Sequence, residues 1–255
     1  MNTYIIVLLR TEGMSNYMRY VAEKKKLILT ENNSAEFRFI KENALFKDLD
    51  DNDYALIQEK VSPFVNIYKK NETVANQGHE CNHLGILVSG QAYSEKYHID
   101  GFRQIIGHYR KNSLLCMESA FSRNGTSPVT IIAKTECRIV WFSLLKLLDS
   151  QLLMPEIKVK LYKNIMYEMA DENIRLMYKS DVLAHHTLRD RVMAYLSIIS
   201  EKRRSNEIHI HMTQVDFADY LCVDRSALSA ELNAMRREGL ISYKKDFFII
   251  HVKPD

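Results

Sequence analysis

Residues 213–229 constrain the fold of this chain more than any other stretch, because their pattern is that of two short helices joined by a tight turn. Thr213 and Asp216 are spaced as in a capping box, although Asp stands where Glu or Gln is usual. The first helix then has apolar residues at helical spacing, namely Phe217, Ala218 and Leu221. A residue as small as Ala218 lets a second helix cross closely, so the pattern predicts a helix-turn-helix.

The second helix is expected to begin after Asp224, which is a good N-cap residue. Cys222 stands at the turn, where glycine is usual because a left-handed backbone costs other residues about 1 kcal/mol. One face of this helix forms an apolar seam of Leu228, Leu232 and Met235. Its other faces carry Arg225, Ser226, Ser229, Asn233, Arg236 and Arg237. A helix of this kind suits insertion into the major groove of DNA.

Gly239 follows Arg236 and Arg237 and is expected to end the second helix as a C′ glycine. Beyond it, residues 240–244 and 247–252 have the pattern of two short strands, with Lys244 and Lys245 near the tip of their hairpin. Such a hairpin is a wing, whose lysines can contact phosphates. The alternative is a helical hairpin packed in another kind of domain, with its charges merely solvated. The capped turn, the exposed basic face and the wing together favour DNA binding.

Glycine placement divides the chain into two parts. Five glycines fall between Gly78 and Gly107, whereas none occurs between Gly125 and Gly239. Frequent glycines among short apolar runs indicate β structure, and a glycine-free stretch suits helices. Six runs are expected to be strands: 64–68, 84–88, 92–98, 102–109, 129–134 and 137–142. Asp100-Gly101 and Asn124-Gly125 mark turns. The first domain is therefore expected to be a small antiparallel barrel or roll.

A long helix is expected to begin at Pro155 and to continue to about Asp181. Its apolar residues recur at a spacing of four, at Ile157, Leu161, Ile165 and Met169, and Ile174 and Met177 continue the pattern. A helix of about 27 residues spans roughly 40 Å, which is longer than one small domain needs. The favoured interpretation is a two-fold dimer seam, and the alternative is a core helix of the β domain. Residues 189–200 predict a further helix.

In this order of parts the chain resembles the Crp/Fnr family of bacterial regulators, over about residues 45–252. The resemblance in the first half rests on Gln77-Gly78, residues 84–90, Asp100-Gly101, Gly107, Met117-Glu118 and residues 133–135. In the second half it rests on residues 223–229 and 236–241, which are similar to the clostridial-type members. It implies an α+β chain with a cyclic-nucleotide-binding-type antiparallel β-roll, a long dimerisation helix and a C-terminal winged helix-turn-helix. It also implies a homodimer on a two-fold site in double-stranded DNA, controlled by a small-molecule effector, and it allows a contact with RNA polymerase.

The resemblance sets expected domain boundaries and effector residues. We expect an extension at 1–44, an effector-sensing roll at 45–153, the dimerisation helix at 154–182 and the DNA-binding domain at 183–255. Family members that bind cyclic AMP hold it with Gly-Glu and Arg-Ser pairs, which here correspond to Met117-Glu118 and Ser127-Pro128. A buried phosphate without that arginine loses a contact worth roughly 1.5–3 kcal/mol. The effector is therefore expected to be another small molecule, held near Met117, Glu118, Ser127 and Thr130.

The resemblance also limits which residues can read DNA. Ala230 stands where many relatives have a base-reading arginine, which is worth about 1–3 kcal/mol of discrimination. Arg225, Ser226 and Ser229 remain the expected groove contacts. We expect Thr213 and Gln214 to contact phosphates, together with Arg236, Lys244 and Lys245. From His185 onward there are 11 Lys/Arg and 10 Asp/Glu, so the attraction to DNA must come from local placement.

The cysteines and histidines carry the strongest competing hypotheses. Cys81, Cys116, Cys137 and Cys222 lack paired spacing, so they are expected to be free thiols in a reducing bacterial cytoplasm. His79, Cys81 and His83 form the one ligand-rich patch, which leaves haem or metal sensing open and would suit a cupin-like metalloenzyme if the side chains converged. A dimeric scaffold without DNA is a further alternative. The sequence specifies no cofactor, and we expect no catalytic site and no metal site.

The beginning of the chain is less informative. The apolar run 4–9 is too short to span a membrane, and no cleavage pattern follows it, so no membrane partner is expected. Residues 1–44 could be a pendant strand–helix element or the product of an upstream start codon, and the sequence supports both.

Overall fold

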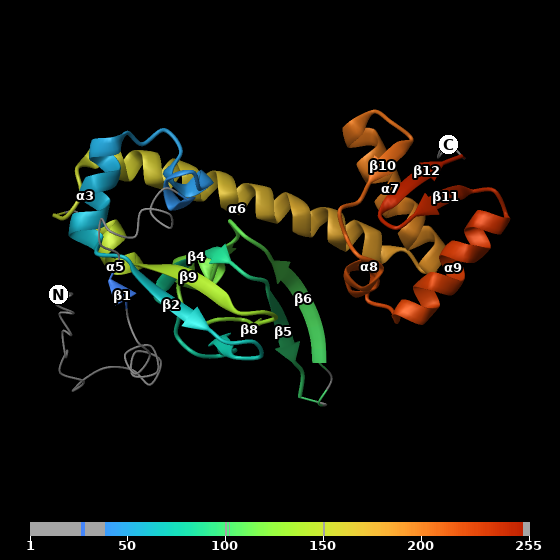
Figure 1. Cartoon of the computed structure of the whole chain (residues 1–255), viewed down its shortest axis with the longest axis horizontal. Helices are drawn as coiled ribbons and strands as arrows, with labels where there is room; N and C mark the ends of the chain where they lie inside the picture. The colour runs from blue at the N-terminus through green and yellow to red at the C-terminus, as the bar shows by residue number, and fades with distance from the viewer. Residues whose placement is uncertain (1–26, 29–38, 100, 102, 150, 252–255) are drawn as a thin grey trace, which may run out of the picture. The chain divides into compact units, whose positions relative to one another are not determined.

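The computed structural model describes residues 27–28, 39–99, 101, 103–149 and 151–251. The chain divides into two compact units, Met1–Glu168 and Met169–Asp255. The boundary falls inside the long helix α6, Pro155–Ala184, which is the yellow helix of Figure 1. Most of the expected extension 1–44 lies outside the described residues, as do Asp100 and Phe102.

The first unit contains two antiparallel sheets (Figure 1). The larger sheet has the order β1 (Leu27–Ile28), β2 (Phe64–Tyr68), β9 (Cys137–Ser143), β4 (His83–Ser89) and β7 (Leu114–Leu115). The smaller sheet has the order β3 (Thr73–Ala75), β8 (Thr130–Ala133), β5 (Ala92–Tyr97) and β6 (Arg103–Tyr109). The six predicted strands are confirmed with shifts of one residue or so at their ends. β1, β3 and β7 were not expected, because runs of two or three residues carry no readable alternation.

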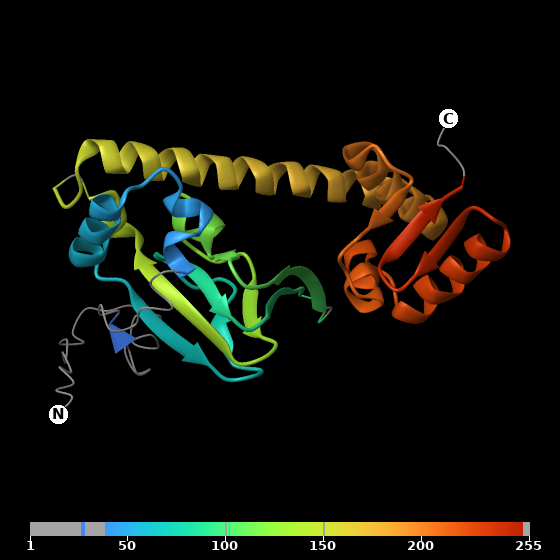
Figure 2. The same cartoon turned by 45° about the horizontal axis from the view of Figure 1, so that its top comes forward.

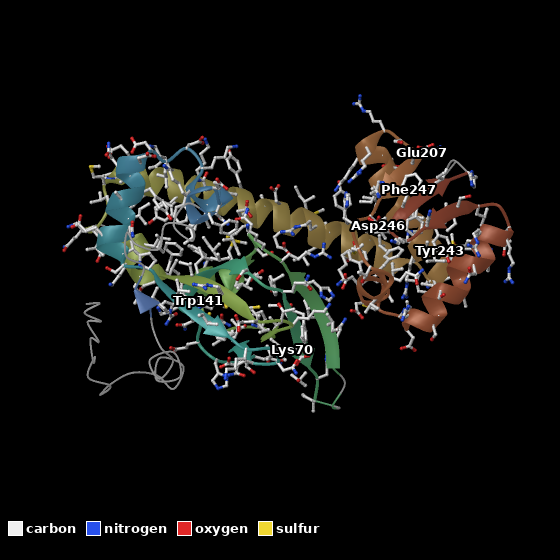
Figure 3. The ribbon with its side chains drawn as sticks, in the orientation of Figure 1. Lys70, Trp141, Glu207, Tyr243, Asp246 and Phe247 are labelled. Carbon is white, nitrogen blue, oxygen red and sulfur yellow. The ribbon has the colours of Figure 1, made fainter. Side chains whose placement is uncertain are left out.

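Strand β9 supplies side chains to two separate cores. Ile139 and Trp141 belong to a cluster with residues of both sheets, including Leu87 of β4 and Ile131 of β8. The alternate residues of β9 belong to a second cluster, formed with the helical segments. A strand that is buried on both faces has an almost continuous apolar sequence, as 137–142 does. Figure 3 labels Trp141 on this strand.

Gly85 leaves room for the indole of Trp141, which lies against it from the neighbouring strand. The two residues are register partners on β4 and β9. A Cβ atom on residue 85 would lie 2.8 Å from Cζ3 of Trp141, which is closer than real Cβ atoms approach. The glycine therefore serves here to make room for the ring rather than to form a turn.

The second cluster is covered by short helices that the sequence pattern did not predict. These are the 3₁₀ helix η1 (Ala44–Phe46) and the helices α3 (Asp51–Val61), α4 (Met117–Phe121) and α5 (Leu144–Leu148). α3 begins at a complete capping box of Asp50 and Asp53. Its buried face consists of Tyr54, Ile57 and Val61 only. Only three buried apolar residues in a charged segment make a weak periodic signal, so the sequence pattern does not predict this helix.

The first half of α6 is a core helix of the first unit, so the expectation that its whole apolar repeat forms a dimer seam is wrong. Ile157, Leu161 and Ile165 are almost fully buried in the cluster with α3 and β9. Asn164 lies on the same face, and its Nδ2 donates to the carbonyl oxygens of Leu45 at 3.0 Å and Lys47 at 2.7 Å. Spacing alone indicates a face, whereas the partner of that face depends on the tertiary fold.

The second unit has a three-stranded sheet packed with helices (Figure 2). Its elements are α7 (Leu188–Arg203), β10 (Glu207–His209), α8 (Gln214–Leu221), α9 (Arg225–Arg237), β11 (Ile241–Lys244) and β12 (Phe247–Ile250). The sheet order is β10-β12-β11, with antiparallel pairing throughout. Val182 of α6 belongs to its core. The predicted helices and wing strands are confirmed, and β10 is an additional strand.

Gly90 gives a sharp test of backbone packing in the first unit. Its φ is +94°, and an added Cβ would lie 2.1 Å from the carbonyl oxygen of Glu136 and 2.9 Å from Cα of Cys137. We expect Gly90→Ala to lower the free energy of unfolding by about 3 kcal/mol or more, since neither backbone can move cheaply. Urea denaturation measures this loss.

Gly78→Ala is the matched control. Gly78 also has a positive φ, +78°, but nothing lies within 4 Å of an added Cβ. Gly78→Ala should lower the free energy of unfolding by only about 1 kcal/mol, because the only strain is that of a side chain on a left-handed backbone. Equal losses for the two variants would contradict the steric explanation.

Candidate nucleic-acid interface and effector site

Helix α8 begins and ends as its sequence predicts. The N–H of Asp216 donates to Oγ1 of Thr213 at 3.1 Å, and the N–H of Thr213 donates back to Oδ2 of Asp216 at 3.4 Å. This is a complete capping box. Cys222 ends the helix in the left-handed region with φ 56°, as expected for the turn position. Phe217, Ala218 and Leu221 are buried in the core of the second unit.

Helix α9 follows after a short turn and is also well terminated. Asp224 adopts the extended N-cap conformation, but its side chain makes no capping hydrogen bond. At the other end Gly239 has φ +74°, its N–H donates to the carbonyl of Arg236, and the N–H of Leu240 donates to that of Met235. These two bonds form a Schellman motif, which confirms the predicted C′ glycine.

The two faces of α9 differ as predicted. Leu228, Leu232 and Met235 are fully buried. Arg225 and Ser226 are exposed in the first turn, and Ser229 is half-buried one turn later. The end of this helix that follows the turn therefore presents a guanidinium and hydroxyls to solvent. These are the groups that bind base edges in a major groove.

The wing is joined to α9 by side-chain contacts. The hydroxyl of Tyr243 on β11, labelled in Figure 3, donates to Oδ1 of Asn233 at 3.2 Å. Nη2 of Arg236 donates to the same oxygen at 3.0 Å, and its guanidinium lies over the Tyr243 ring. Arg236 is thus exposed but held in place. Sequence reasoning did not identify Asn233 or Tyr243 as a link, because the contact joins two elements.

Two lysines lie at the tip of the wing. Lys244 pairs with Phe247 across the hairpin, and Lys245 begins its two-residue loop with φ 58°. Both side chains are exposed. Thr213 is exposed and Gln214 half-buried at the start of α8, where free backbone N–H groups favour anions. The second unit therefore offers cationic and N–H donors from α8, α9 and the wing.

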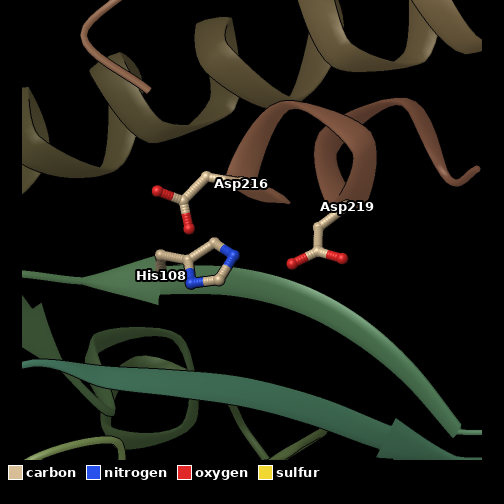
Figure 4. Close-up of side chains that lie close together, drawn as sticks. All are labelled: His108, Asp216 and Asp219. Atoms are coloured by element: carbon tan, nitrogen blue, oxygen red, sulfur yellow. The ribbon is translucent and has the colours of Figure 1, made fainter. Parts of the chain in front are cut away.

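Figure 4 shows the two carboxylates of α8, Asp216 and Asp219, and His108 on β6. His108 belongs to the first unit and the two aspartates to the second. Asp216 is buried, and its carboxylate caps its own helix.

The structure places the four expected effector residues in different surroundings. Met117 is buried in the cluster with α3 and α6, whereas the neighbouring Glu118 is exposed on α4. Ser127 is buried, and its hydroxyl donates to the carbonyl of Val129 at 2.7 Å. Thr130 is buried on β8, and its Oγ1 accepts from the N–H of Gln77 at 3.1 Å.

A polar group near Thr130 was missed by sequence reasoning. Glu95 on β5 pairs with Thr130 across the sheet and is fully buried. The hydroxyl of Tyr97 donates to Oε1 of Glu95 at 2.5 Å. Gln77 joins the same region, since its Oε1 accepts from the N–H of Tyr97 at 3.0 Å. A β-bulge at Ser94 and Glu95 shifts the register there, and nothing in the sequence alternation announces a bulge.

The ligand-rich patch does not converge on one point. His79 is exposed, with its Nδ1 3.2 Å from the carbonyl oxygen of Gln77. His83 is buried with its ring edge against Phe64, and Cys81 is buried with its thiol donating to the carbonyl of His83. Among the described residues of either unit taken alone, no three His, Cys, Asp or Glu ligand atoms lie together. The arrangement that a cupin-like site needs is not formed by this patch.

Cys116 lies against Cys81 in the core of the roll. Its thiol pKa is raised well above the usual value, first by a hydrogen bond with Cys81 and then by burial. Burial also raises the pKa of Cys137. Cys81, Cys116 and Cys137 are buried and Cys222 is exposed, and all four are free thiols.

No helix in the described part of the chain is long and apolar enough to cross a membrane.

Two family models match the chain in the expected order. The cyclic nucleotide-binding domain model matches residues 65–149, and the Crp-like helix-turn-helix domain model matches residues 190–254. None of the curated protein sequences matches the chain.

Solved structures show the same fold. FixK2 from Bradyrhizobium japonicum is 17% identical, with a TM-score of 0.54, and the match covers 74% of this chain and 93% of that chain. The c-di-GMP-responsive regulator CLP of Xanthomonas campestris is 15% identical, with a TM-score of 0.56 and coverages of 80% and 100%. CprK in complex with OCPA is 16% identical, with a TM-score of 0.54 and coverages of 76% and 88%. With both domains present in this order, the chain belongs to the Crp/Fnr family of effector-responsive, DNA-binding transcription regulators.

Proposed function

We propose that α9 is the recognition helix and that Arg225, Ser226 and Ser229 contact base edges in the major groove of double-stranded DNA. One observation carries this proposal: α9 buries its whole apolar seam while the first turn, with Arg225 and Ser226, faces solvent. A helix docked through its N-terminal residues places those side chains nearest to the bases. Ala230 is exposed beside them and can add only an apolar contact.

The phosphate contacts come from the start of α8, from the wing and from the end of α9. Thr213 and Gln214 lie at the start of α8, where backbone N–H groups attract an anion. Lys244 and Lys245 extend from the wing, and Arg236 is held beside it by Asn233 and Tyr243. With 11 basic and 10 acidic residues from His185 onward, these few cations carry most of the attraction.

The protein acts as a homodimer through the exposed face of α6. Side chains on this face recur at alternating spacings of three and four: Val159, Tyr162, Met166, Met169, Asn173 and Leu176. The five apolar members are between 41% and 69% exposed. This is a heptad pattern, and the single asparagine at an a position favours a two-stranded, in-register pair. A two-fold pair presents two recognition helices to half-sites about 34 Å apart.

An effector in the roll controls this DNA binding. We place it near Glu118, Ser127 and Thr130, with Met117 on the buried side of α4. A small molecule other than cyclic AMP suits a site without the phosphate-binding arginine. Binding there shifts the balance between two arrangements of the paired α6 helices and so changes the spacing of the recognition helices. This role belongs in a bacterial cytoplasm, and activation would include a contact with RNA polymerase.

Arg225→Ala tests the recognition helix. We expect it to weaken binding to the preferred operator by about 1–3 kcal/mol, while binding to unrelated duplex DNA changes much less, because a base contact is lost. Fluorescence anisotropy at fixed salt measures both affinities. Lys146→Ala, which removes an exposed cation from α5 of the other unit, is the control. Equal operator affinity for Arg225→Ala and the parent would remove the reading role.

Met169→Glu tests the dimer seam. A carboxylate buried against its symmetry mate should cost about 2 kcal/mol or more, so the variant should sediment mainly as a monomer at micromolar concentration. Ile174→Glu is the matched control, because Ile174 is 47% exposed on the same helix but lies outside the heptad positions. A dimer that survives Met169→Glu, or one that only Ile174→Glu disrupts, would contradict this seam.

A further inference from the structure

Two charged residues of the second unit are placed against the preference of their own helices. Arg189 lies in the first turn of α7, at the positive end of the helix dipole. Glu238 is the C-cap of α9, at the negative end of that dipole. Each charge is locally unfavourable, so its placement has to be explained by a contact beyond its own helix.

The two residues bind one another, and Arg189 also reaches a second carboxylate of α9. Nη1 and Nη2 of Arg189 donate to the two carboxylate oxygens of Glu238 at 2.6 and 2.9 Å. Nε donates to Oε1 of Glu231 at 2.7 Å. One guanidinium therefore holds α9 at two points that are about two turns apart, with the fixed geometry of a bidentate pair.

A second arginine in the same part of α7 reaches the neighbouring elements. Nε of Arg191 donates to the carbonyl of His185, the residue that follows α6, at 2.9 Å. Its Nη1 donates to the carbonyl of Leu221, the last residue of α8, at 3.4 Å. The start of α7 is thus hydrogen-bonded to the exit from α6, to the end of α8 and to α9.

We propose that Arg189, with Arg191, is a positioning residue that couples the end of α6 to the recognition helix. The inference rests on the proposed role of α9 in reading DNA. The apolar seam of α9 supplies cohesion, but hydrophobic contact is not directional and tolerates small rotations of a helix. The forked ion pair sets the rotation of α9 about its axis and therefore the direction in which Arg225 points.

The three side chains of this ion pair are partly exposed, so a positioning role can be distinguished from a purely structural one. The side chains of Arg189, Glu231 and Glu238 are 36%, 25% and 48% exposed. Ion pairs that remain this accessible to water contribute little to stability. Loss of the pair should therefore change DNA affinity more than it changes the melting temperature.

The ion pair also predicts a pH dependence. The hydrogen bonds from Arg189, and then the charges of Arg189 and Arg237, hold the pKa of Glu238 below its usual value. The contribution of Glu238 to stability is therefore present above the pKa that this carboxyl has in the unfolded chain. It is lost as the pH falls through the lowered pKa of Glu238 in the folded protein. Because the pair is partly exposed, this change in stability is small, and titration of Glu238 itself is the better measurement. NMR of the Glu238 carboxyl carbon across the acidic range should show a lowered pKa in the parent and a pKa that rises towards its usual value in Arg189→Gln. A Glu238 pKa that Arg189→Gln leaves unchanged would contradict the pairing.

Operator binding by Arg189→Lys and Arg189→Gln tests the proposal at fixed salt. Lysine keeps the charge but not the fork, so we expect both variants to bind about tenfold more weakly than the parent, with melting temperatures close to it. The triple variant Arg189→Gln/Glu231→Gln/Glu238→Gln removes all three charges. If Arg189 positions α9, the triple variant should bind the operator as weakly as Arg189→Gln does. If Arg189 only neutralises two carboxylates near DNA, the triple variant should regain the operator affinity of the parent, and the proposal is overturned.

The affinities of Arg189→Lys and of the parent protein each test the proposal further. Parent-like affinity in Arg189→Lys overturns the positioning role even if Arg189→Gln fails to fold. A parent protein that binds no DNA overturns the proposed function itself, and this result is distinct from a difference between variants. Arg203→Gln is the matched control, because Arg203 is an exposed arginine of α7 whose guanidinium contacts His211 rather than α9. It should bind as the parent does.

Discussion

The DNA-binding unit depends on the burial of one face of α9 against α8, α7 and the wing sheet. Leu228, Leu232 and Met235 are fully buried in one cluster with Phe217 and Phe248. Because the three large apolar side chains of α9 are all used in this contact, the opposite face has no packing role and is free to carry Arg225 and Ser226. Directional hydrogen bonds fix the C-terminal end of α9, through the Schellman motif at Gly239 and the two bonds from Arg189 to Glu238.

The first unit is organised by a different constraint, the burial of one sheet on both faces. β9 contributes alternate residues to the core between the sheets and to the core under the helices. The second of these cores needs a cover, and α3 with the first half of α6 provides it. α6 consequently has two kinds of surface: an inner face with Ile157 and Leu161, and an outer face with Met166 and Met169. Only the outer face is available to a second copy of the chain.

The roll matches the cyclic nucleotide-binding domain model, and it contains a buried polar group. Buried Glu95 beside Tyr97 and Thr130 is a feature of this chain that its place on β5 did not reveal. Met117 belongs to the core under the helices, where its side chain packs with α3 and α6. Under the proposed function, the effector meets these groups in a roll without the arginine and differs chemically from cyclic AMP.

The sequence by itself determined the local elements and their ends. The capping box at Thr213, the left-handed turn at Cys222 and the C′ glycine at 239 depend only on neighbouring residues, so pattern and propensity suffice to predict them. The same holds for the six main strands and the wing. Which faces of the helices and strands pack together depends on the tertiary structure alone. The buried half of α6, the bulge at Glu95 and the Arg189–Glu238 pair join residues far apart in the chain. Side-chain periodicity indicates that a face is apolar, but the geometry of the whole fold selects its partner.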